Sequence, residues 1–278
     1  ADIHPSVFYA QAAQIGGNML LDDGAKFEGQ VWLLGAKIEG ALSCGAGRFL
    51  NPGGEALVAA SAEIGGGALL RCEGLNRFQA QGGVNLFGAK IAGTLDFDGA
   101  SLNNKGGYAL VGANAEIRGG IRMGSNGAHP FEAAGEVSLL GAKITGNLEC
   151  AGGRFINDGG AALVLSNAEI GGTVFLCAMA THAFEAEGQV SFLGARINGS
   201  LDCSGARIKA IGGRSLSADN VQVGGAVLLR AASQYMFEAQ GHVSFLGAKM
   251  GGNLECTGAR FLNPGGYAFG AENAEISG

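Results

Sequence analysis

The sequence predicts an all-β fold: a right-handed parallel β-helix built from a 53-residue repeat of two three-sided coils, about ten coils in all. A stretch of the form Val-x-Leu/Phe-Leu/Phe-Gly-Ala-Lys/Arg-Ile/Met recurs at a fixed spacing of 53 residues, starting at Val31, Val84, Val137, Val190 and Val243. Apolar residues alternate with polar or small ones at period two between the glycines, which is typical of half-buried strands. A fixed repeat of short strands indicates a solenoid.

A weaker echo divides each unit into two coils of about 24 and 29 residues, and the second coil carries an extra loop. Ile144, Leu148 and Cys150 are expected to face inward in one coil, and Ile170 takes the equivalent place in the next. Helix is disfavoured because glycine recurs every few residues and lowers helix stability by about 1 kcal/mol at each interior position. A right-handed coil follows from the usual hand of parallel crossovers.

One repeat position is expected to be a bend between two faces of the coil. It holds glycine in one set of coils, and serine or asparagine in the alternate set. Glycine and asparagine share a tolerance of left-handed backbone. The position comprises Gly35, Gly88, Gly141, Gly194 and Gly247, alternating with Ser61, Asn114, Asn167, Asn220 and Asn273.

Composition excludes several classes of protein. Only 4 prolines accompany 52 glycines, which argues against collagen and proline-rich disorder. No apolar run approaches the roughly 18 residues of a membrane span, so no transmembrane segment is predicted. The net charge of −6 argues against a nucleic-acid partner, which requires a basic surface. No leader segment is visible, although the first residue is Ala1 and a leader already removed is compatible with this start.

The six cysteines are predicted to be free thiols. Cys44, Cys150, Cys203 and Cys256 occupy one repeat position, which holds Phe97 in the remaining unit and is therefore expected to be buried. Cys150, Cys203 and Cys256 are separated by two coils each, about 9.6 Å, whereas a disulfide needs Cα atoms within about 7 Å. Free thiols favour a reducing compartment such as the cytoplasm. No cofactor or metal is predicted.

The steps Gly141-Ala142-Lys143-Ile144-Thr145-Gly146-Asn147-Leu148 resemble the G-A-x-I-x-G-x-L pattern of a bacterial β-solenoid repeat family often labelled membrane-associated oxidoreductase. More distantly the chain is similar to bactofilins and pentapeptide-repeat proteins. The resemblance covers almost the whole chain, and its motifs specify a scaffold. The family label implies redox chemistry, but the sequence holds no dinucleotide fingerprint, so that activity is not carried over. The similarity to bactofilins implies a non-catalytic filament former.

The residue before the inward isoleucine is charged in nearly every coil, and basic and acidic residues alternate. Adjacent strands lie about 4.8 Å apart, so each charge is expected to have opposite charges above and below it. We interpret this column as a lock on the register of the stack, with a specific binding stripe as the alternative. The charge ladder comprises Lys37, Glu63, Lys90, Glu116, Lys143, Glu169, Arg196, Gln222, Lys249 and Glu275.

A second outward column contains apolar residues, among them Leu69, Phe175 and Leu228. They either form a contact surface or are covered by the long loop that follows. Asp96, Asp98, Arg122 and Glu149 are expected to cluster on this face. A salt-bridged surface is the favoured interpretation of that cluster, and the acid/base group of a carbohydrate-active enzyme is the alternative. The whole column reads Leu20, Ser43, Leu69, Asp96, Arg122, Glu149, Phe175, Asp202, Leu228, Glu255.

Four long loops, 72–77, 125–130, 178–183 and 231–236, depart from the repeat. Variable loops on one side of a regular scaffold are where specificity usually lies. With Leu69, Phe175 and Leu228, the loop residues His129, His182, Tyr235 and Met236 form the candidate interaction surface for a protein partner. His129 and His182 lie two coils apart, about 9.6 Å, which is too far for one shared metal ion.

Residues 1–278 are predicted to form a single β-helix whose units begin near 31, 84, 137, 190 and 243. The sequence starts and stops in mid-coil without the polar caps of a solenoid, so we expect a longer chain or an assembly. The predicted function is that of a non-enzymatic structural element that forms a rod or filament by end-to-end contact with itself. The alternatives are a protein-binding scaffold that uses the long loops and a carbohydrate-active β-helix enzyme.

Overall fold

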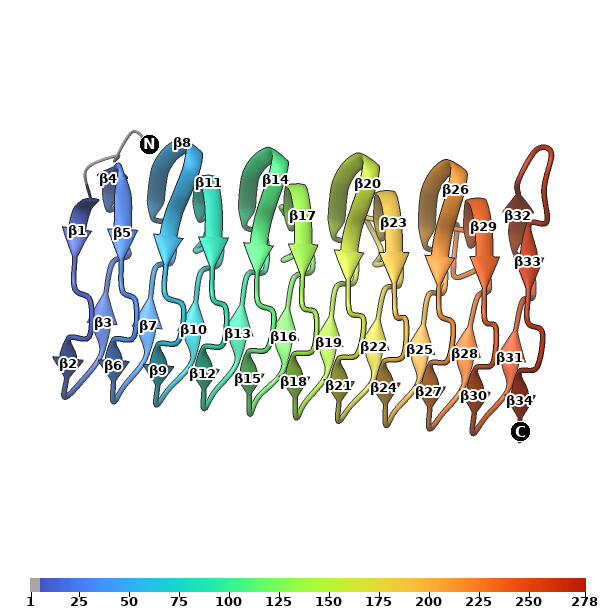
Figure 1. The fold of residues 1–278 in the computed structure, drawn as a ribbon. Helices are drawn as coiled ribbons and strands as arrows, with labels where there is room; N and C mark the ends of the chain where they lie inside the picture. The colour runs from blue at the N-terminus through green and yellow to red at the C-terminus, as the bar shows by residue number, and fades with distance from the viewer. Residues whose placement is uncertain (1–5) are drawn as a thin grey trace.

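The computed structural model describes residues 6–278, which form a continuous parallel β-solenoid of about ten coils without a helix in that range (Figure 1). The three sides of the coil are three parallel sheets, named here A, B and C, with 13, 11 and 10 strands. The predicted fold class and the two three-sided coils per unit are therefore confirmed. Residues 1–5, where the predicted domain begins, lie outside the described residues.

Sheet A holds the longest strands, up to 11 residues. Its strands are β1 (Ser6–Tyr9), β4 (Lys26–Glu28), β5 (Gln30–Trp32), β8 (Arg48–Val58), β11 (Gln79–Asn85), β14 (Ser101–Val111), β17 (Glu132–Ser138), β20 (Arg154–Val164), β23 (Glu185–Ser191), β26 (Arg207–Ser217), β29 (Glu238–Ser244), β32 (Arg260–Leu262) and β33 (Phe269–Gly270).

Sheet B carries the predicted charge ladder on two-residue strands. They are β2 (Gln14–Ile15), β6 (Lys37–Ile38), β9 (Glu63–Ile64), β12 (Lys90–Ile91), β15 (Glu116–Ile117), β18 (Lys143–Ile144), β21 (Glu169–Ile170), β24 (Arg196–Ile197), β27 (Gln222–Val223), β30 (Lys249–Met250) and β34 (Glu275–Ile276).

Sheet C carries the second outward column, also on two-residue strands. They are β3 (Met19–Leu20), β7 (Leu42–Ser43), β10 (Ala68–Leu69), β13 (Leu95–Asp96), β16 (Ile121–Arg122), β19 (Leu148–Glu149), β22 (Val174–Phe175), β25 (Leu201–Asp202), β28 (Val227–Leu228) and β31 (Leu254–Glu255).

The core is a thin prism of stacked apolar columns, as the alternation predicts. Ile144, Leu148, Cys150 and Ile170 are all buried, none more than 2% exposed. Phenylalanines fill the side of the prism beneath sheet A, and their rings stack from coil to coil, with centroids 5.2–5.3 Å apart between Phe131, Phe155 and Phe184. Such offset aromatic pairs contribute about 0.5–1.5 kcal/mol beyond their buried area.

The predicted bend lies between sheets A and B and has the left-handed backbone that its residues favour. Gly141 has a φ of 64° and Asn167 a φ of 57°, and the other glycine, serine and asparagine residues of the position agree within a few degrees. This confirms the bend at all ten positions named from the sequence.

A second bend, between sheets B and C, holds glycine in every coil for a different reason. In successive coils the backbones meet here, and from Gly40 to Gly252 each glycine N–H donates to the carbonyl of the glycine one coil earlier, as Gly146 does to Gly119 at 2.9 Å. A Cβ at Gly146 would lie 2.9–3.0 Å from backbone atoms of Gly119 and Gly120. The column comprises Gly17, Gly40, Gly66, Gly93, Gly119, Gly146, Gly172, Gly199, Gly225, Gly252 and Gly278.

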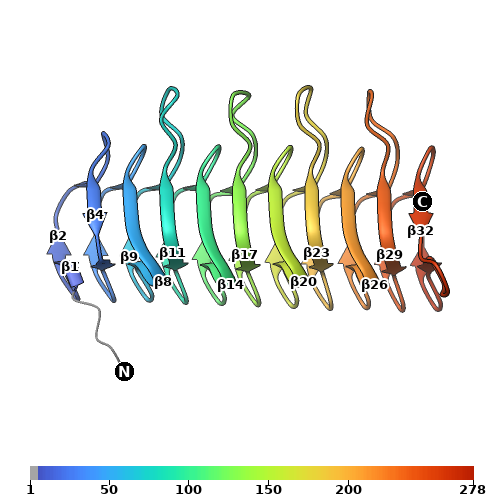
Figure 2. The same ribbon diagram turned by 90° about the horizontal axis from the view of Figure 1, so that it is seen from above.

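The longer coils carry two extensions instead of the one extra loop that the repeat suggests. The long loops rise in a row along one side of the stack, as Figure 2 shows. The 11-residue strands of sheet A also bend outward in an arc, where the pairing register shifts, and these arcs curl at the top of Figure 1. In the arc of β20, Asn157 Nδ2 donates to the Ala161 carbonyl at 2.8 Å and Gly159 has a φ of 78°.

Candidate interaction surfaces

The charge ladder lies on sheet B in the predicted register. Lys90 pairs with Glu63 on one side and with Glu116 on the other, and Lys143 pairs with Glu116 and Glu169. Among the described residues, ion pairs of this column form between Lys37 and Glu63 and between Lys249 and Glu275, each at 3.4 Å. The other ladder charges are aligned but lie beyond ion-pair distance in that part of the chain. Exposed pairs of this kind contribute about 0.2–1 kcal/mol each.

A second ladder, on sheet A, has closer contacts and was not predicted. Arg154 lies 3.2 Å from Glu132 and 3.3 Å from Glu185, and Arg207 and Arg260 continue the alternation with Glu185 and Glu238. Each arginine immediately precedes an inward Phe or Ile at the start of a sheet A strand. Three of the five repeat units show the alternation completely. In the other two the equivalent places hold Lys26 with Arg48, which are both basic, and Gln79 with Ser101.

The apolar residues of sheet C alternate with acids and do not form a continuous patch. Phe175 pairs with Glu149 and Asp202, and Leu228 pairs with Asp202 and Glu255. Leu69, Phe175 and Leu228 are half-buried. Their use as a contact surface stays a prediction.

The acidic cluster of sheet C is a salt-bridged surface, as the favoured interpretation held. Arg71 lies 3.2 Å from Asp96, and Arg122 lies 2.6 Å from Asp98 and 3.8 Å from Glu149. Burial raises the pKa of Asp98, although the Gly124 N–H and Arg122 act in the opposite direction. Both aspartates are at most 9% exposed, so neither carboxylate is presented to a substrate.

The long loops form a ridge in which each loop contacts the next. Ser125 Oγ lies 3.2 Å from His182 Nδ1, which also lies 2.9 Å from Thr181 Oγ1. One repeat further on, Gln234 Nε2 donates to the Ala180 carbonyl at 3.5 Å. The Arg207 guanidinium lies 6.0 Å from the centre of the Tyr235 ring, a cation–π distance.

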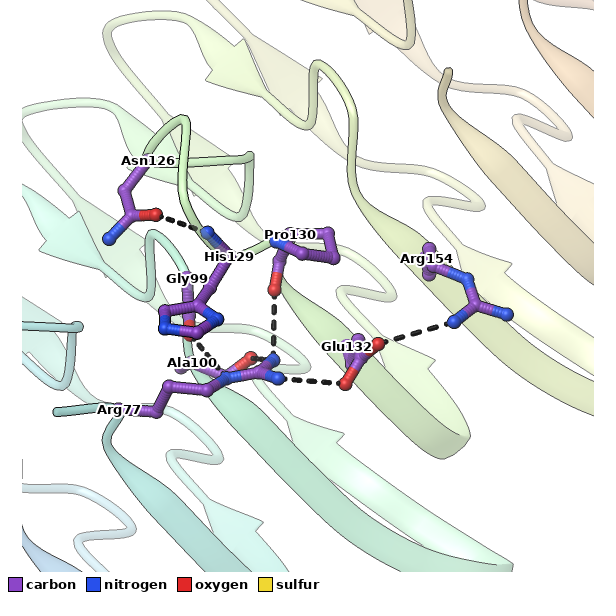
Figure 3. A network of polar contacts seen from close by, with 8 residues as sticks. All are labelled: Arg77, Gly99, Ala100, Asn126, His129, Pro130, Glu132 and Arg154. Atoms are coloured by element: carbon purple, nitrogen blue, oxygen red, sulfur yellow. Dashed lines mark hydrogen bonds and ion pairs between the residues drawn. The ribbon is translucent and has the colours of Figure 1, made fainter. Parts of the chain in front are cut away.

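Arg77 ties the first long loop to the second (Figure 3). Its guanidinium donates to the carbonyls of Gly99, Ala100 and Pro130 at 2.8–2.9 Å, and it pairs with Glu132 at 3.0 Å. Glu132 in turn reaches Arg154 and so connects the loops to the ladder of sheet A. The repeat offers no signal for this role because the equivalent position holds Pro130, Ala183 and Met236 in the other loops.

The predicted loop residues differ in how they are presented. His129, His182 and Tyr235 are half-buried within the ridge, whereas Met236 is 41% exposed at its surface. The Asn126 side chain accepts the His129 N–H at 2.7 Å and shapes that loop. The depressions of the described surface are shallow and open, and three of them lie along sheet B beside the charge ladder.

Within residues 6–278 no three His, Cys, Asp or Glu side chains are grouped in a way that could hold a metal ion. Within the same residues no helix is long and apolar enough to cross a membrane.

Comparison of the chain with protein-family models, curated proteins and solved structures gave no match. The class that the structure defines is therefore the β-solenoid repeat protein. The resemblance to the G-A-x-I-x-G-x-L repeat family stays a prediction that rests on the sequence pattern.

Proposed function

We propose that this protein is a non-enzymatic structural rod whose role is to extend by stacking coil on coil. The observation that carries the proposal is the uniformity of the stack: three sheets run in parallel register through successive coils, and each inner coil is paired on both sides. Because the stack repeats one geometry along its length, a further coil can pair with either end in the same way as the inner coils pair with each other.

The edges of the stack supply the stacking contact. Within the described residues, β3 pairs only with β7 at one edge of sheet C, and β31 pairs only with β28 at the other. Side chains at core positions are exposed in the coil at the edge: Ile276 is 47% exposed, whereas Ile170, at the equivalent position inside the stack, is 2% exposed. Further coils of the same chain or a second copy would pair the free backbone groups and cover the apolar core.

The chemistry of the surface supports a non-catalytic role. A carbohydrate-active enzyme needs an acid and a base accessible from a groove. Asp96 and Asp98 instead lie buried in ion pairs with Arg71 and Arg122. Redox activity, which the family label implies, is not part of the proposal, because Cys150 and Cys203 are wholly buried and their pKa values are raised by burial.

A second candidate function is a scaffold for a protein partner at the loop ridge. The observation that favours it is the exposure of large apolar side chains at the ridge surface, Leu75 at 80% and Met236 at 41%. Specificity would come from the loops, which differ in sequence on a constant frame.

Matched edge variants test end-to-end stacking. Phe8→Lys places a charge in the core position of the first strand, and Ile276→Lys does so in the last one. Tyr9→Lys and Ser277→Lys are the controls, since these neighbouring side chains point outward and are exposed. We expect rods longer than one copy in electron micrographs of the wild type and both controls, and particles no longer than one copy with either edge variant.

A mixture of the two edge variants sharpens the test. Each variant keeps one intact edge, so the mixture should give rods of two copies that do not grow further. Wild-type protein that stays a single copy at high concentration, or edge variants that still form long rods, would contradict stacking through these edges.

A further inference from the structure

A stripe of large apolar side chains follows the bend between sheets A and B. These residues immediately precede the bend glycine, and backbone hydrogen bonds at the bend hold successive coils in register, such as Asn114 N–H to the Leu140 carbonyl at 2.8 Å. Leu34 is half-buried, and the others are 41–47% exposed. This corner stripe comprises Leu34, Phe87, Leu140, Leu193 and Leu246.

Small or polar residues occupy the stripe in the alternate coils. Ala60 and Ala113 are almost fully buried, so each leaves a gap between two large side chains. The alternate coils contribute Ala60, Ala113, Ser166, Asp219 and Glu272. The stripe is therefore a regular series of projections and gaps with a period of two coils, about 9.6 Å.

The charge ladder on the other side of the same bend has the same period and a fixed phase. Every coil with a large stripe residue carries a basic ladder residue, as Leu140 does with Lys143. The coils with a small stripe residue carry an acidic one, as Ala113 does with Glu116, except that Gln222 follows Asp219. When two such corners face each other and one is displaced by one coil along the rod axis, projections face gaps and positive charges face negative charges at the same time.

We propose that this corner is an interface for a second copy of the chain, which lies alongside in the antiparallel direction. Facing surfaces displaced by one coil place projections in gaps and opposite charges along the rim. Rim charges of this kind select the register more than they add affinity. The contact is lateral, so it goes beyond the end-to-end stacking proposed above and does not depend on it.

The best register follows from the sequence of the stripe. A two-fold axis that passes through the interface at right angles to both rods, level with the space between the coils of Ala113 and Leu140, exchanges the two copies. The contact is then self-complementary, as a closed dimer requires. Ten coils then overlap, about 48 Å along the axis, and the eight from that of Leu34 to that of Asp219 carry the complementary pairs. The facing pairs are Leu140 with Ala113, Leu193 with Ala60, Phe87 with Ser166, Lys143 with Glu116, Arg196 with Glu63, and Lys90 with Glu169.

Like charges do not face each other in this register: Lys37 faces Gln222, and Leu34 faces Asp219 at the margin. Lys90, Glu116, Lys143, Glu169 and Arg196 form no ion pair inside the described chain, so their charges are available to the second copy. A narrow strip of this length is at the small end of specific interfaces, and dimerisation should therefore be reversible and concentration-dependent.

Sedimentation velocity over a wide concentration range tests the pairing. The edge variant Ile276→Lys removes end-to-end stacking and leaves the corner intact, so it serves as the background. We expect a reversible dimer that Leu140→Glu with Leu193→Glu weakens about tenfold or more, because two acids then enter the apolar contact. Leu75→Glu with Ile211→Glu is the matched control, since both residues are exposed and lie off the stripe.

Mixed cysteine variants test direction and register, with Cys177→Ser and Cys256→Ser removing the two cysteines that are not buried. Leu193→Cys mixed with Ala60→Cys should form a disulfide-linked dimer. Leu193→Cys mixed with Ser166→Cys should not, because an antiparallel pair holds these sites apart, whereas a parallel pair would join them. Either variant alone should not cross-link, since its two copies of the site lie about 24 Å apart.

A monomer at every concentration, a dimer that survives the double glutamate substitution, or cross-linking of the Leu193 and Ser166 pair would overturn the proposal. Failure of this dimer leaves stacking in the wild type unaffected, so the two proposals are judged separately.

Discussion

At the residue scale, close backbone contact requires glycine at one position in each coil that stacks on an earlier coil. The bend between sheets B and C brings successive backbones together, and Gly146 N–H bonds to the Gly119 carbonyl at 2.9 Å. Even one methyl group at this position would have to push two coils apart. The glycine content of the chain is thus explained in part by stacking distance, and not by backbone flexibility alone.

Gly146→Ala should destabilise the protein by about 1–3 kcal/mol, the usual effect of overpacking a closely packed site. The added Cβ would lie 2.9–3.0 Å from backbone atoms that cannot rotate away. Gly17→Ala is the matched control: Gly17 holds the same place in the first coil, and a Cβ there would meet nothing within 4 Å. Urea unfolding midpoints measure both, and equal effects of the two substitutions would refute the explanation.

Asp219 is a buried carboxylate whose charge should make stability depend on pH. Burial alone raises its pKa, but hydrogen bonds from Ser244 and Arg214 outweigh burial and hold the pKa below its ordinary value of 3.8. The unfolded chain therefore takes up the proton more readily than the folded one. The stabilisation is present above pH 3.8 and is lost as the pH falls through the lower folded value.

Asp219→Asn should accordingly lower the unfolding temperature at neutral pH, because Arg214 loses its charged partner. The difference from the wild type should shrink as the pH falls below 3.8. Melting curves measured from neutral to acidic pH check this, and a difference that stays constant down to the lowest pH would contradict it.

At the scale of elements, a single arginine organises two of the long loops. Arg77→Lys should loosen the loop 125–130, because an ammonium group cannot serve four acceptors in the plane of a guanidinium. Hydrogen exchange should become faster in residues 125–130 and stay unchanged in 178–183, to which Arg77 makes no hydrogen bond. Arg48→Lys, on the exposed face of sheet A, is the control.

Unchanged exchange in residues 125–130 would mean that the loop is held by its own turn contacts, such as Asn126 with His129. Arg77→Lys should lower the free energy of unfolding by about 1–3 kcal/mol, the usual effect of leaving a buried hydrogen-bond acceptor unpaired.

The sheets and bends could be predicted from the sequence because they follow the period of the repeat. Ile144 is buried, Asn167 is left-handed and Lys143 lies between two glutamates, each as its repeat position requires. The arcs were missed since they lie inside strands and keep the alternation on either side. The corner stripe was missed because period two breaks at the bend, so Leu140 cannot be assigned to either face from its neighbours.

The candidate surface was less predictable for a different reason. The sequence determines which charges share a column, but side-chain rotamers decide which of them touch. Lys90 and Glu116 are paired in register without an ion pair, whereas Arg154 contacts two glutamates on sheet A. Arg77 depends on the distance between loops two coils apart, which no single repeat encodes.

At the scale of the whole molecule, four cysteines at one repeat position report on the state of the stack. Cys44, Cys150 and Cys203 belong to coils that have a neighbouring coil on each side, and they are buried. Cys256 follows the last strand of sheet C and is exposed. Cys177 is half-buried on the side of the stack, and burial raises the pKa of its thiol to about 11. Cys256 therefore marks the edge of the stack, and Cys177 marks its side.

End-to-end stacking should protect Cys256 from alkylation as protein concentration rises, because the added copy covers the open edge of sheet C. The rate at Cys177 should not change, since that thiol lies on the side of the stack and serves as an internal control. Lateral pairing at the corner of sheets A and B leaves both thiols open. Peptide mass spectrometry measures the alkylation rates of both thiols together. A Cys256 rate that does not depend on concentration would show that this edge stays uncovered and would exclude stacking there.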